Sequence, residues 1–378
     1  MDKSWELPNP FLKEDHTLIS TVEEWEVQRK WIKDMLAEWM YGVAPPNPGT
    51  QSYQELSREA WGDNGMCEKI RITTGEGGRI VFDTTVFRPV GNELSIPVVF
   101  LGWKKWLTDD IIQEALVQGF CLVSFAFDQA APDSFDYLGA SCATAYPGYS
   151  WKVLSMWAWM ASRVIDWLQT VNFVDNSKIV VTGHSRFGKA ALCCGIYDER
   201  VAVCAPAGSG CGGMGSLRLT GGRMGRDVGE VERIGYMLSP EHFGYWLADR
   251  LAEYGRIGTR EPYRENELPF DANFLGAMIA PRRLLLMEGL DDTWSNPYGT
   301  QAAWMAAGEV FAFLDAGEHC AIHYREGGHR YHLDDWKILF DFCKASLNGI
   351  PKRTDYKTVL EVDAKSGYSW RNPRTTSH

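Results

Sequence analysis

A serine in the stretch VVTGHSRFGKAAL (180–192) has the surroundings of a catalytic nucleophile. Residues typical of a buried strand precede Ser185 and residues typical of a helix follow it, which is the arrangement of a nucleophile elbow. Strand and helix approach closely at such a turn, so glycines are needed on both sides. Gly183 fills the first place, but Phe187 takes the usual second place and Gly188 follows one residue later. The motif is usable if Phe187 points away from the sheet; otherwise Ser185 is a structural turn residue.

An acid and a histidine should follow the elbow in that order, because a serine hydroxyl needs a neighbouring base. The segment LLLMEGLDDTWSNP places Asp291 and Asp292 directly after an apolar strand, and a Gly-x-x-Asp spacing from Gly289 favours Asp292. The segment YREGGHRYHLDDW offers His329 behind two glycines, with His332 as its competitor. Each could instead serve a turn, a helix cap or the surface. Their order nevertheless indicates a Ser-His-Asp triad.

Two other kinds of site are less well supported. The histidines of HRYH (329–332), followed by Asp334 and Asp335, could ligate a metal, but the chain has no HExxH motif and no second cluster at metal-ligand spacing. The glycine-rich run GSGCGGMGSLRLTGG (208–222) lacks the GxxxxGK[ST] order of a phosphate loop. The sequence therefore predicts an enzyme with neither a metal nor an organic cofactor.

The elements that must position these residues alternate between strands and helices, which predicts an α/β fold with a mostly parallel, doubly wound sheet after an antiparallel start. An amphipathic helix is expected at 20–41, where Thr21 and Glu24 form a capping-box pattern. Further helices are expected around 151–170, after the elbow, and at 334–347. The expected strands are 69–74, 79–89, 96–102, 120–127, 178–183, 201–206, 282–289 and 319–327.

The length and composition fit one catalytic domain. The chain has 378 residues, 45% of them hydrophobic, and α/β folds of this size are often single domains. We expect a helical and loop extension at 1–65, a catalytic core at 66–349 and a tail at 350–378, all within one domain spanning 1–378.

The charge and the cysteine content limit the kinds of partner and the cellular compartment that we expect. A net charge of −11 argues against a nucleic-acid partner, and no run of about 18 apolar residues predicts a membrane span. The nine cysteines include no CxxC pair, so we expect them to be reduced and buried. The first residues lack a secretory signal, which favours the cytoplasm, or secretion if a signal peptide has been removed. The oligomeric state is left open.

Several blocks of the sequence resemble one known family. They are LPNPF (7–11), EEWEVQRKWIKDMLAEWMYGVAP (23–45), GHSRFGKAAL (183–192), YDERVAVCAPAGSGCGG (197–213), LPFD (268–271), AMIAPRRLLL (277–286), DDTWSNPYG (291–299), REGGH (325–329) and DDW (334–336). In this order they resemble the glucuronoyl esterases, carbohydrate esterase family fifteen, and their bacterial relatives. The resemblance implies an α/β-hydrolase that cleaves the ester between 4-O-methyl-glucuronic acid on xylan and an alcohol of lignin.

The resemblance also implies roles for single residues. Ser185 matches the nucleophile and His329 the base. Arg186 follows the nucleophile, so its backbone N–H and its guanidinium could stabilise the oxyanion. Lys189 matches a lysine that contacts the sugar hydroxyls, and Trp294 a tryptophan that lines the sugar pocket. Glu230 is a further candidate for substrate binding.

Two positions depart from the family pattern. Many members carry the catalytic glutamate where this chain has Gly208, so Asp292 is the natural substitute, with Glu230 or Glu288 as alternatives. Members often have a histidine where this chain has Asn273, which predicts an altered pocket. Other hypotheses therefore remain open: an esterase of methyl-esterified uronates, of acetylated sugars or of other small esters, and a catalytically silent carbohydrate-binding relative.

Overall fold

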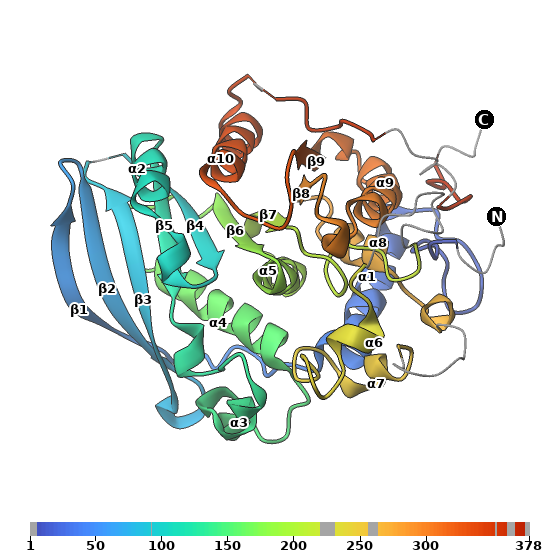
Figure 1. Cartoon of the computed structure of the whole chain (residues 1–378), viewed down its shortest axis with the longest axis horizontal. Helices are drawn as coiled ribbons and strands as arrows, with labels where there is room; N and C mark the ends of the chain where they lie inside the picture. The colour runs from blue at the N-terminus through green and yellow to red at the C-terminus, as the bar shows by residue number, and fades with distance from the viewer. Residues whose placement is uncertain are drawn as a thin grey trace.

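A computed structural model describes residues 6–91, 93–219, 231–255, 264–351, 354–360 and 367–374. Within these ranges, nine strands form one sheet in the order β1-β2-β3-β5-β4-β6-β7-β8-β9 (Figure 1). The strands are β1 (Ser52–Trp61), β2 (Gly65–Thr74), β3 (Ile80–Pro89), β4 (Ile96–Leu101), β5 (Phe120–Phe125), β6 (Ile179–His184), β7 (Val201–Ala207), β8 (Arg283–Gly289) and β9 (Cys320–Arg325). The α-helices are α1 (Val22–Leu36), α2 (Asp109–Val117), α3 (Ser141–Ala145), α4 (Val153–Leu168), α5 (Arg186–Tyr197), α6 (Ile234–Met237), α7 (Asp249–Ala252), α8 (Ala272–Ala277), α9 (Pro297–Phe313) and α10 (Leu333–Asn348).

The sheet is parallel from β4 to β9 and antiparallel from β1 to β3, as the sequence predicted. The strand β1 was not predicted: the sheet begins at Ser52, inside the segment expected to contain only helices and loops. Most of its side chains are exposed, so the alternation of apolar and polar residues that marks a half-buried strand is absent. The division into extension, core and tail stays a prediction.

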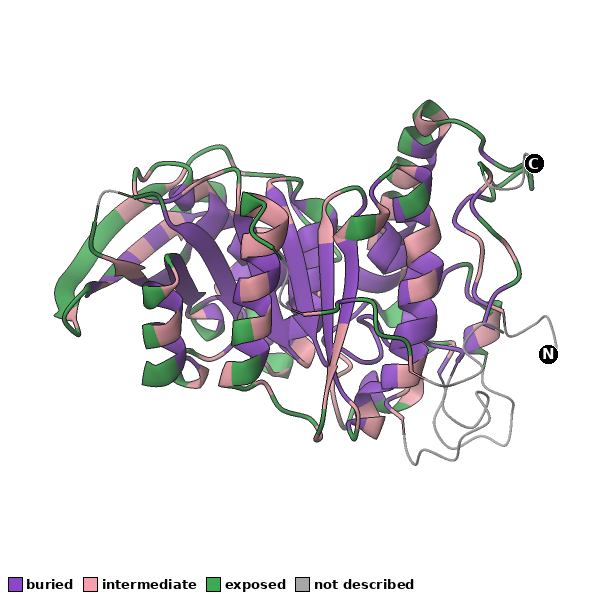
Figure 2. Ribbon diagram, turned by 90° about the horizontal axis from the view of Figure 1, so that it is seen from above, coloured by how far each residue is buried: buried purple, intermediate pink, exposed green. Residues whose placement is uncertain are grey.

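The central strands are buried on both faces. Every residue of β4, β5 and β6 is buried, and Figure 2 shows these strands in purple with exposed green at the outer edge of the sheet. Val181 of β6 packs into a cluster with α4, α5, α8 and α9, whereas its neighbour Val180 packs into a second cluster with α2 and α10. Helices on both faces explain why these strands read as continuous apolar runs.

The N-terminal helix follows its sequence signals. Thr21 and Glu24 form the expected capping box at the start of α1, and a short π-helix continues the helix to Tyr41. The cysteine prediction is confirmed, since all nine are free and eight are buried. Within the described ranges, no helix combines the length and the apolar character that crossing a bilayer would require.

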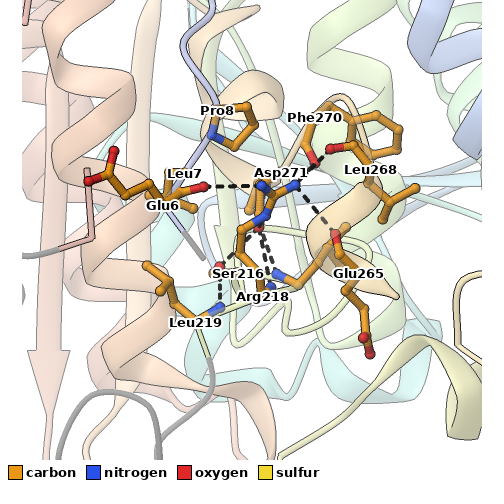
Figure 3. Close-up of polar contacts among 12 residues, drawn as sticks. Glu6, Leu7, Pro8, Ser216, Arg218, Leu219, Glu265, Leu268, Phe270 and Asp271 are labelled. Atoms are coloured by element: carbon orange, nitrogen blue, oxygen red, sulfur yellow. Dashed lines mark hydrogen bonds and ion pairs between the residues drawn. The ribbon is translucent and has the colours of Figure 1, made fainter. Parts of the chain in front are cut away.

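A buried ion pair between Arg218 and Asp271 links two loops, and a further hydrogen bond of Arg218 ties them to the N-terminal segment (Figure 3). Asp271, the aspartate of LPFD, is fully buried and accepts from Arg218 Nε at 3.0 Å and from the backbone N–H of Leu217 at 2.8 Å. Arg218 also donates to the carbonyls of Glu6, Leu268 and Phe270. Asn273, where an altered pocket was expected, is buried as well and donates to the carbonyl of Pro8 at 2.9 Å. Its amide contacts the N-terminal segment.

Candidate active site

Ser185 lies in a strained turn between β6 and α5. Its backbone adopts φ 59° and ψ −126°, a conformation that L residues rarely adopt and that often marks functional sites. A Cβ at Gly183 would lie 2.5 Å from the carbonyl oxygen of Phe187, so only glycine fits there. The Phe187 side chain is fully buried and stacks on Trp157 of α4 at 4.9 Å. The condition set for this irregular elbow is met, since Phe187 packs among aromatic residues on the α4 side of α5.

Asp292 and His329 form a close pair beside this turn. His329 Nδ1 lies 2.7 Å from Asp292 Oδ2 and 3.1 Å from Ser295 Oγ. The Asp292 side chain is only 3% exposed. Burial acts to raise the pKa of Asp292, but the hydrogen bond and charge of His329 and hydrogen bonds from Ser295 outweigh it, so the pKa lies below its ordinary value. Asp292 is therefore an ionised acceptor that fixes the tautomer of His329.

The histidine also lies close to the elbow. Within the described ranges, no hydrogen bond joins Ser185 Oγ to His329, and such catalytic contacts are often long before substrate binds. Instead, the ring centroid of His184, the residue before Ser185, lies 4.4 Å from that of His329. The ring of His184 is in turn parallel to that of Tyr331, with an interplanar angle of 6°. The three segments predicted to carry the triad therefore meet at one end of the sheet.

The competing candidates have other contacts. Asp291 is exposed, and its Oδ2 accepts from the backbone N–H of Gly327 at 3.1 Å, as a turn aspartate would. His332 is the N-cap residue of α10, and its backbone N–H donates to Asp335 Oδ2 at 2.8 Å. Among the described residues, no hydrogen bond or ion pair joins the side chain of Asp291 or His332 to the His329–Asp292 pair.

Arg186 begins α5, where backbone N–H groups have no partner within the helix. Its guanidinium donates from Nη1 to Asp133 Oδ2 at 2.6 Å. It also lies 4.9 Å from the ring centroid of Phe243 and 4.7 Å from that of Trp246. With 27% of its side chain exposed, Arg186 is both anchored and open to the solvent side of the elbow.

Lys189 is buried one helical turn beyond Ser185. Its ammonium donates to the Ser209 carbonyl and to Glu232 Oε2, both at 2.7 Å, and its side chain is 2% exposed. The backbone N–H of Glu232 donates to the carbonyl of Trp294 at 2.9 Å, which brings the predicted sugar-pocket tryptophan next to the predicted sugar-binding lysine. Glu230 lies outside the described residues. The sequence reading missed Glu232, whose only signal was its position among polar residues after the glycine-rich run.

Comparisons with known proteins identify the family. A family model described as "Glucuronyl esterase, fungi" matches residues 70–315. The chain belongs to the glucuronoyl esterase family. It is 28% identical over 370 residues to 4-O-methyl-glucuronoyl methylesterase 1 of Wolfiporia cocos, with 93% of this chain and 84% of the relative covered.

Solved structures give the same result. A family 15 glucuronoyl esterase from Caldicellulosiruptor kristjansonii is 29% identical and superposes with a TM-score of 0.80, covering 93% of each chain. The catalytic domain from Hypocrea jecorina shares the fold with a TM-score of 0.76 at 22% identity, with 98% of this chain and 96% of that domain covered. The predictions of an α/β-hydrolase fold and of a carboxylic ester hydrolase acting on carbohydrates are confirmed.

Position 208 differs in this glucuronoyl esterase from the pattern expected of its family. Gly208 adopts φ +47°, and a Cβ placed there would lie 3.1 Å from His184 Nε2 and 3.4 Å from Asp292 Oδ2. The carbonyl of Gly208 accepts from Ser295 Oγ at 3.1 Å, and the same hydroxyl reaches His329. A side chain at position 208 would therefore point into the space beside the Asp292–His329 pair.

Two buried titratable groups flank that pair. Burial and the neighbouring His329 lower the pKa of His184 to about 3, so its ring is neutral. Burial and the nearby Asp292 raise the pKa of Glu288 well above its ordinary value. Neither Glu288 carboxyl oxygen has a hydrogen-bond partner among the described residues. A protonated Glu288 is poorly suited to replace Asp292 as the partner of an imidazolium.

Proposed function

We propose that this glucuronoyl esterase cleaves the ester between a 4-O-methyl-glucuronic acid and an alcohol through an acyl-enzyme on Ser185. The observation that carries the proposal is the Asp292–His329 contact of 2.7 Å beside the strained Ser185 elbow. The name of the Wolfiporia cocos relative indicates the acyl group. The chemistry agrees, because a neutral ester is converted into a carboxylate next to two cationic side chains.

Each residue has a defined step in this mechanism. Ser185 Oγ attacks the ester carbonyl while His329 Nε2 accepts its proton, and His329 then gives that proton to the leaving alcohol. Asp292 holds Nδ1–H and stabilises the imidazolium. The Arg186 backbone N–H and guanidinium stabilise the oxyanion. A water molecule activated by His329 then releases the uronic acid and restores Ser185.

The sugar side of the site is assigned to Lys189, Glu232 and Trp294. Among the described residues, the Lys189 ammonium donates two hydrogen bonds, to Ser209 and Glu232, and we assign its third N–H to a sugar hydroxyl. Glu232 holds this ammonium in place and can accept from a second hydroxyl. The partly exposed ring of Trp294, packed edge-on against Tyr236 at 5.0 Å, offers an apolar face to the pyranose.

A substrate panel with an active-site variant tests the proposal. The wild-type protein should hydrolyse benzyl and methyl glucuronates far faster than it deacetylates xylan, and a fluorophosphonate should label it at Ser185. Ser185→Ala should abolish labelling and lower kcat by about a million-fold without changing the melting temperature. Faster release of acetate than of alcohol from glucuronate would replace the proposed substrate. Absence of both labelling and turnover would indicate a silent carbohydrate-binding relative.

A further inference from the structure

The carboxylate of Asp133 binds the Arg186 guanidinium and is itself held by two aromatic residues. It lies in the loop between β5 and α3, far from Arg186 in sequence, and its side chain is 13% exposed. One carboxylate oxygen, Oδ2, accepts from Arg186 Nη1 at 2.6 Å. The other, Oδ1, accepts from Tyr245 Oη at 3.1 Å and from Trp246 Nε1 at 2.8 Å. The Tyr245 hydroxyl also lies 2.9 Å from the Asp133 carbonyl, so this loop and the 245–246 segment are bound together.

The aromatic residues around Asp133 are themselves fixed. Phe243 and Trp246 stack at 3.8 Å with an interplanar angle of 4°, and the guanidinium lies within 5 Å of both ring centroids. The carbonyl of Tyr245 accepts from the backbone N–H of Val153 at the start of α4. Arg186 is therefore held by a carboxylate on one side and by aromatic rings that a core helix supports on the other.

Most donors of Arg186 remain free in this arrangement. A guanidinium has five N–H donors, and within the described ranges the one hydrogen bond of its side chain is that from Nη1 to Asp133. The remaining N–H groups can therefore bind an oxygen that is not part of the protein. A donor that is fixed before the reaction stabilises developing charge without reorganisation.

We propose that Asp133 is a positioning residue that fixes the guanidinium of Arg186 for the oxyanion formed at Ser185. This inference rests on the proposed function, because it assigns the arginine to that oxyanion. Asp133 works against catalysis by charge, since a carboxylate offsets the positive charge of Arg186. It favours catalysis by holding the arginine in place, since an unanchored arginine side chain would lose conformational entropy when it binds the oxyanion. The geometry favours position, because Oδ2 of the carboxylate accepts from Arg186 itself, while Oδ1 is held by Tyr245 and by Trp246, whose ring lies against the guanidinium.

A double-mutant cycle separates these effects. Asp133→Asn keeps the shape of the side chain and removes its charge, and Arg186→Ala removes the group that it positions. Loss of one oxyanion donor costs about 10²–10³ in kcat, which is the expected effect of Arg186→Ala. Asp133→Asn should lower kcat by about ten- to hundredfold, a part of the same loss, with little change in KM. In the Arg186→Ala background it should lower kcat less than about twofold, because its effect is transmitted through the arginine.

Two further variants keep the test independent of folding. Asp136→Asn removes an exposed acid three residues along the same loop, bonded to Ser134, and should leave kcat and the melting temperature unchanged. Tyr245→Phe removes a hydroxyl that reaches Asp133 but leaves the Arg186 contact, so it should lower kcat less than Asp133→Asn does. Thermal unfolding of every variant shows whether a loss of kcat reflects a loss of folded protein.

Several outcomes would overturn the inference. Equal losses from Asp133→Asn with and without Arg186 would mean a structural role, and an unchanged or higher kcat in the Asp133→Asn protein would mean that charge outweighs position. A normal kcat in the Arg186→Ala protein would remove the oxyanion role and this inference together, while Ser185 labelling would still stand. The cycle is measured on whichever ester the wild-type protein hydrolyses. A failure of the glucuronate proposal is therefore seen separately, in the substrate panel.

Discussion

Asp292→Asn is the substitution that tests the acid of this site most sharply. Asp292 Oδ2 accepts from His329 Nδ1, while Oδ1 faces the backbone N–H of Ser295 at 3.3 Å. An asparagine would place its carbonyl oxygen toward the Ser295 N–H and therefore its NH₂ group toward His329. That arrangement favours the tautomer in which Nδ1 accepts and Nε2 carries the proton, so Nε2 cannot take a proton from Ser185.

The expected loss is large because the acid is buried. The Asp292 side chain is 3% exposed, so water has little access to replace the lost acceptor. Forcing the wrong histidine tautomer lowers kcat about ten-thousand-fold in serine hydrolases, which corresponds to about 5 kcal/mol of transition-state stabilisation. KM should change little, because Asp292 contacts His329 and Ser295 rather than the sugar-binding side chains.

Measuring kcat of three proteins on one chromogenic glucuronate ester decides the question. Asp291→Asn is the matched control: among the described residues, the neighbouring exposed carboxylate accepts a single hydrogen bond, from the backbone N–H of Gly327, so a mild loss is expected. A severe loss in the control with a mild loss in Asp292→Asn would move the acid by one residue. Two mild variants would refute the reasoning and direct attention to Glu288, whose raised pKa would then need to be measured directly.

Three other predictions follow from buried groups of the described chain. Glu232→Gln and Lys189→Ala should raise KM for methyl glucuronate more than for an aryl acetate; equal increases for both esters would make the pair purely structural. Burial lowers the pKa of His184 to about 3, whereas a histidine in the unfolded chain has a pKa of about 6.5. Between these two pH values the unfolded chain binds a proton that the folded chain does not, so the free energy of unfolding falls as pH falls, by about 1.5 kcal/mol between pH 6.5 and 5. In the His184→Gln protein, the free energy of unfolding measured with urea should depend less on pH between pH 6.5 and 5. An unchanged pH dependence would contradict the lowered pKa of His184. Arg218→Met should lower the free energy of unfolding by about 3–5 kcal/mol, since it leaves Asp271 buried without its ion-pair partner. Thermal unfolding measures this loss, and a melting temperature close to that of the wild-type protein would contradict the prediction.

The strands and helices that carry the candidate site could be predicted because each carries a local signal. Strands β4 to β9 are apolar runs bounded by turns, and their ends follow the expected limits within a few residues. Ser185 stands in a recognisable strand–turn–helix motif, and the candidates Asp292 and His329 follow apolar strands in the expected order. Parallel strands present their carboxyl ends at one edge of a sheet, so order along the chain was enough to bring these segments together.

The groups that support them could not be predicted, because contacts between distant segments define them. Glu232 binds Lys189, which lies 43 positions away in the sequence, and nothing in the surrounding sequence distinguishes Glu232 from neighbouring acids. Asp133 stands in a PDSFD run that reads as a turn, yet its partners lie at Arg186 and at 245–246. Strand β1 was missed for the opposite reason, since it has almost no buried face.

The glycine at position 208 and the candidate acid at position 292 are physically linked. A Cβ at position 208 would lie 3.4 Å from Asp292 Oδ2 and 3.1 Å from His184 Nε2, so a glutamate there would bring a second carboxylate beside the first. Two carboxylates in a buried space cannot both stay ionised, because each raises the pKa of the other. One would then be protonated and lose its value as partner of the imidazolium. The proposal that Asp292 is the acid therefore predicts that position 208 carries no acid. Glycine meets that need, and it also tolerates the positive φ of the turn and the close approach of the neutral His184 ring.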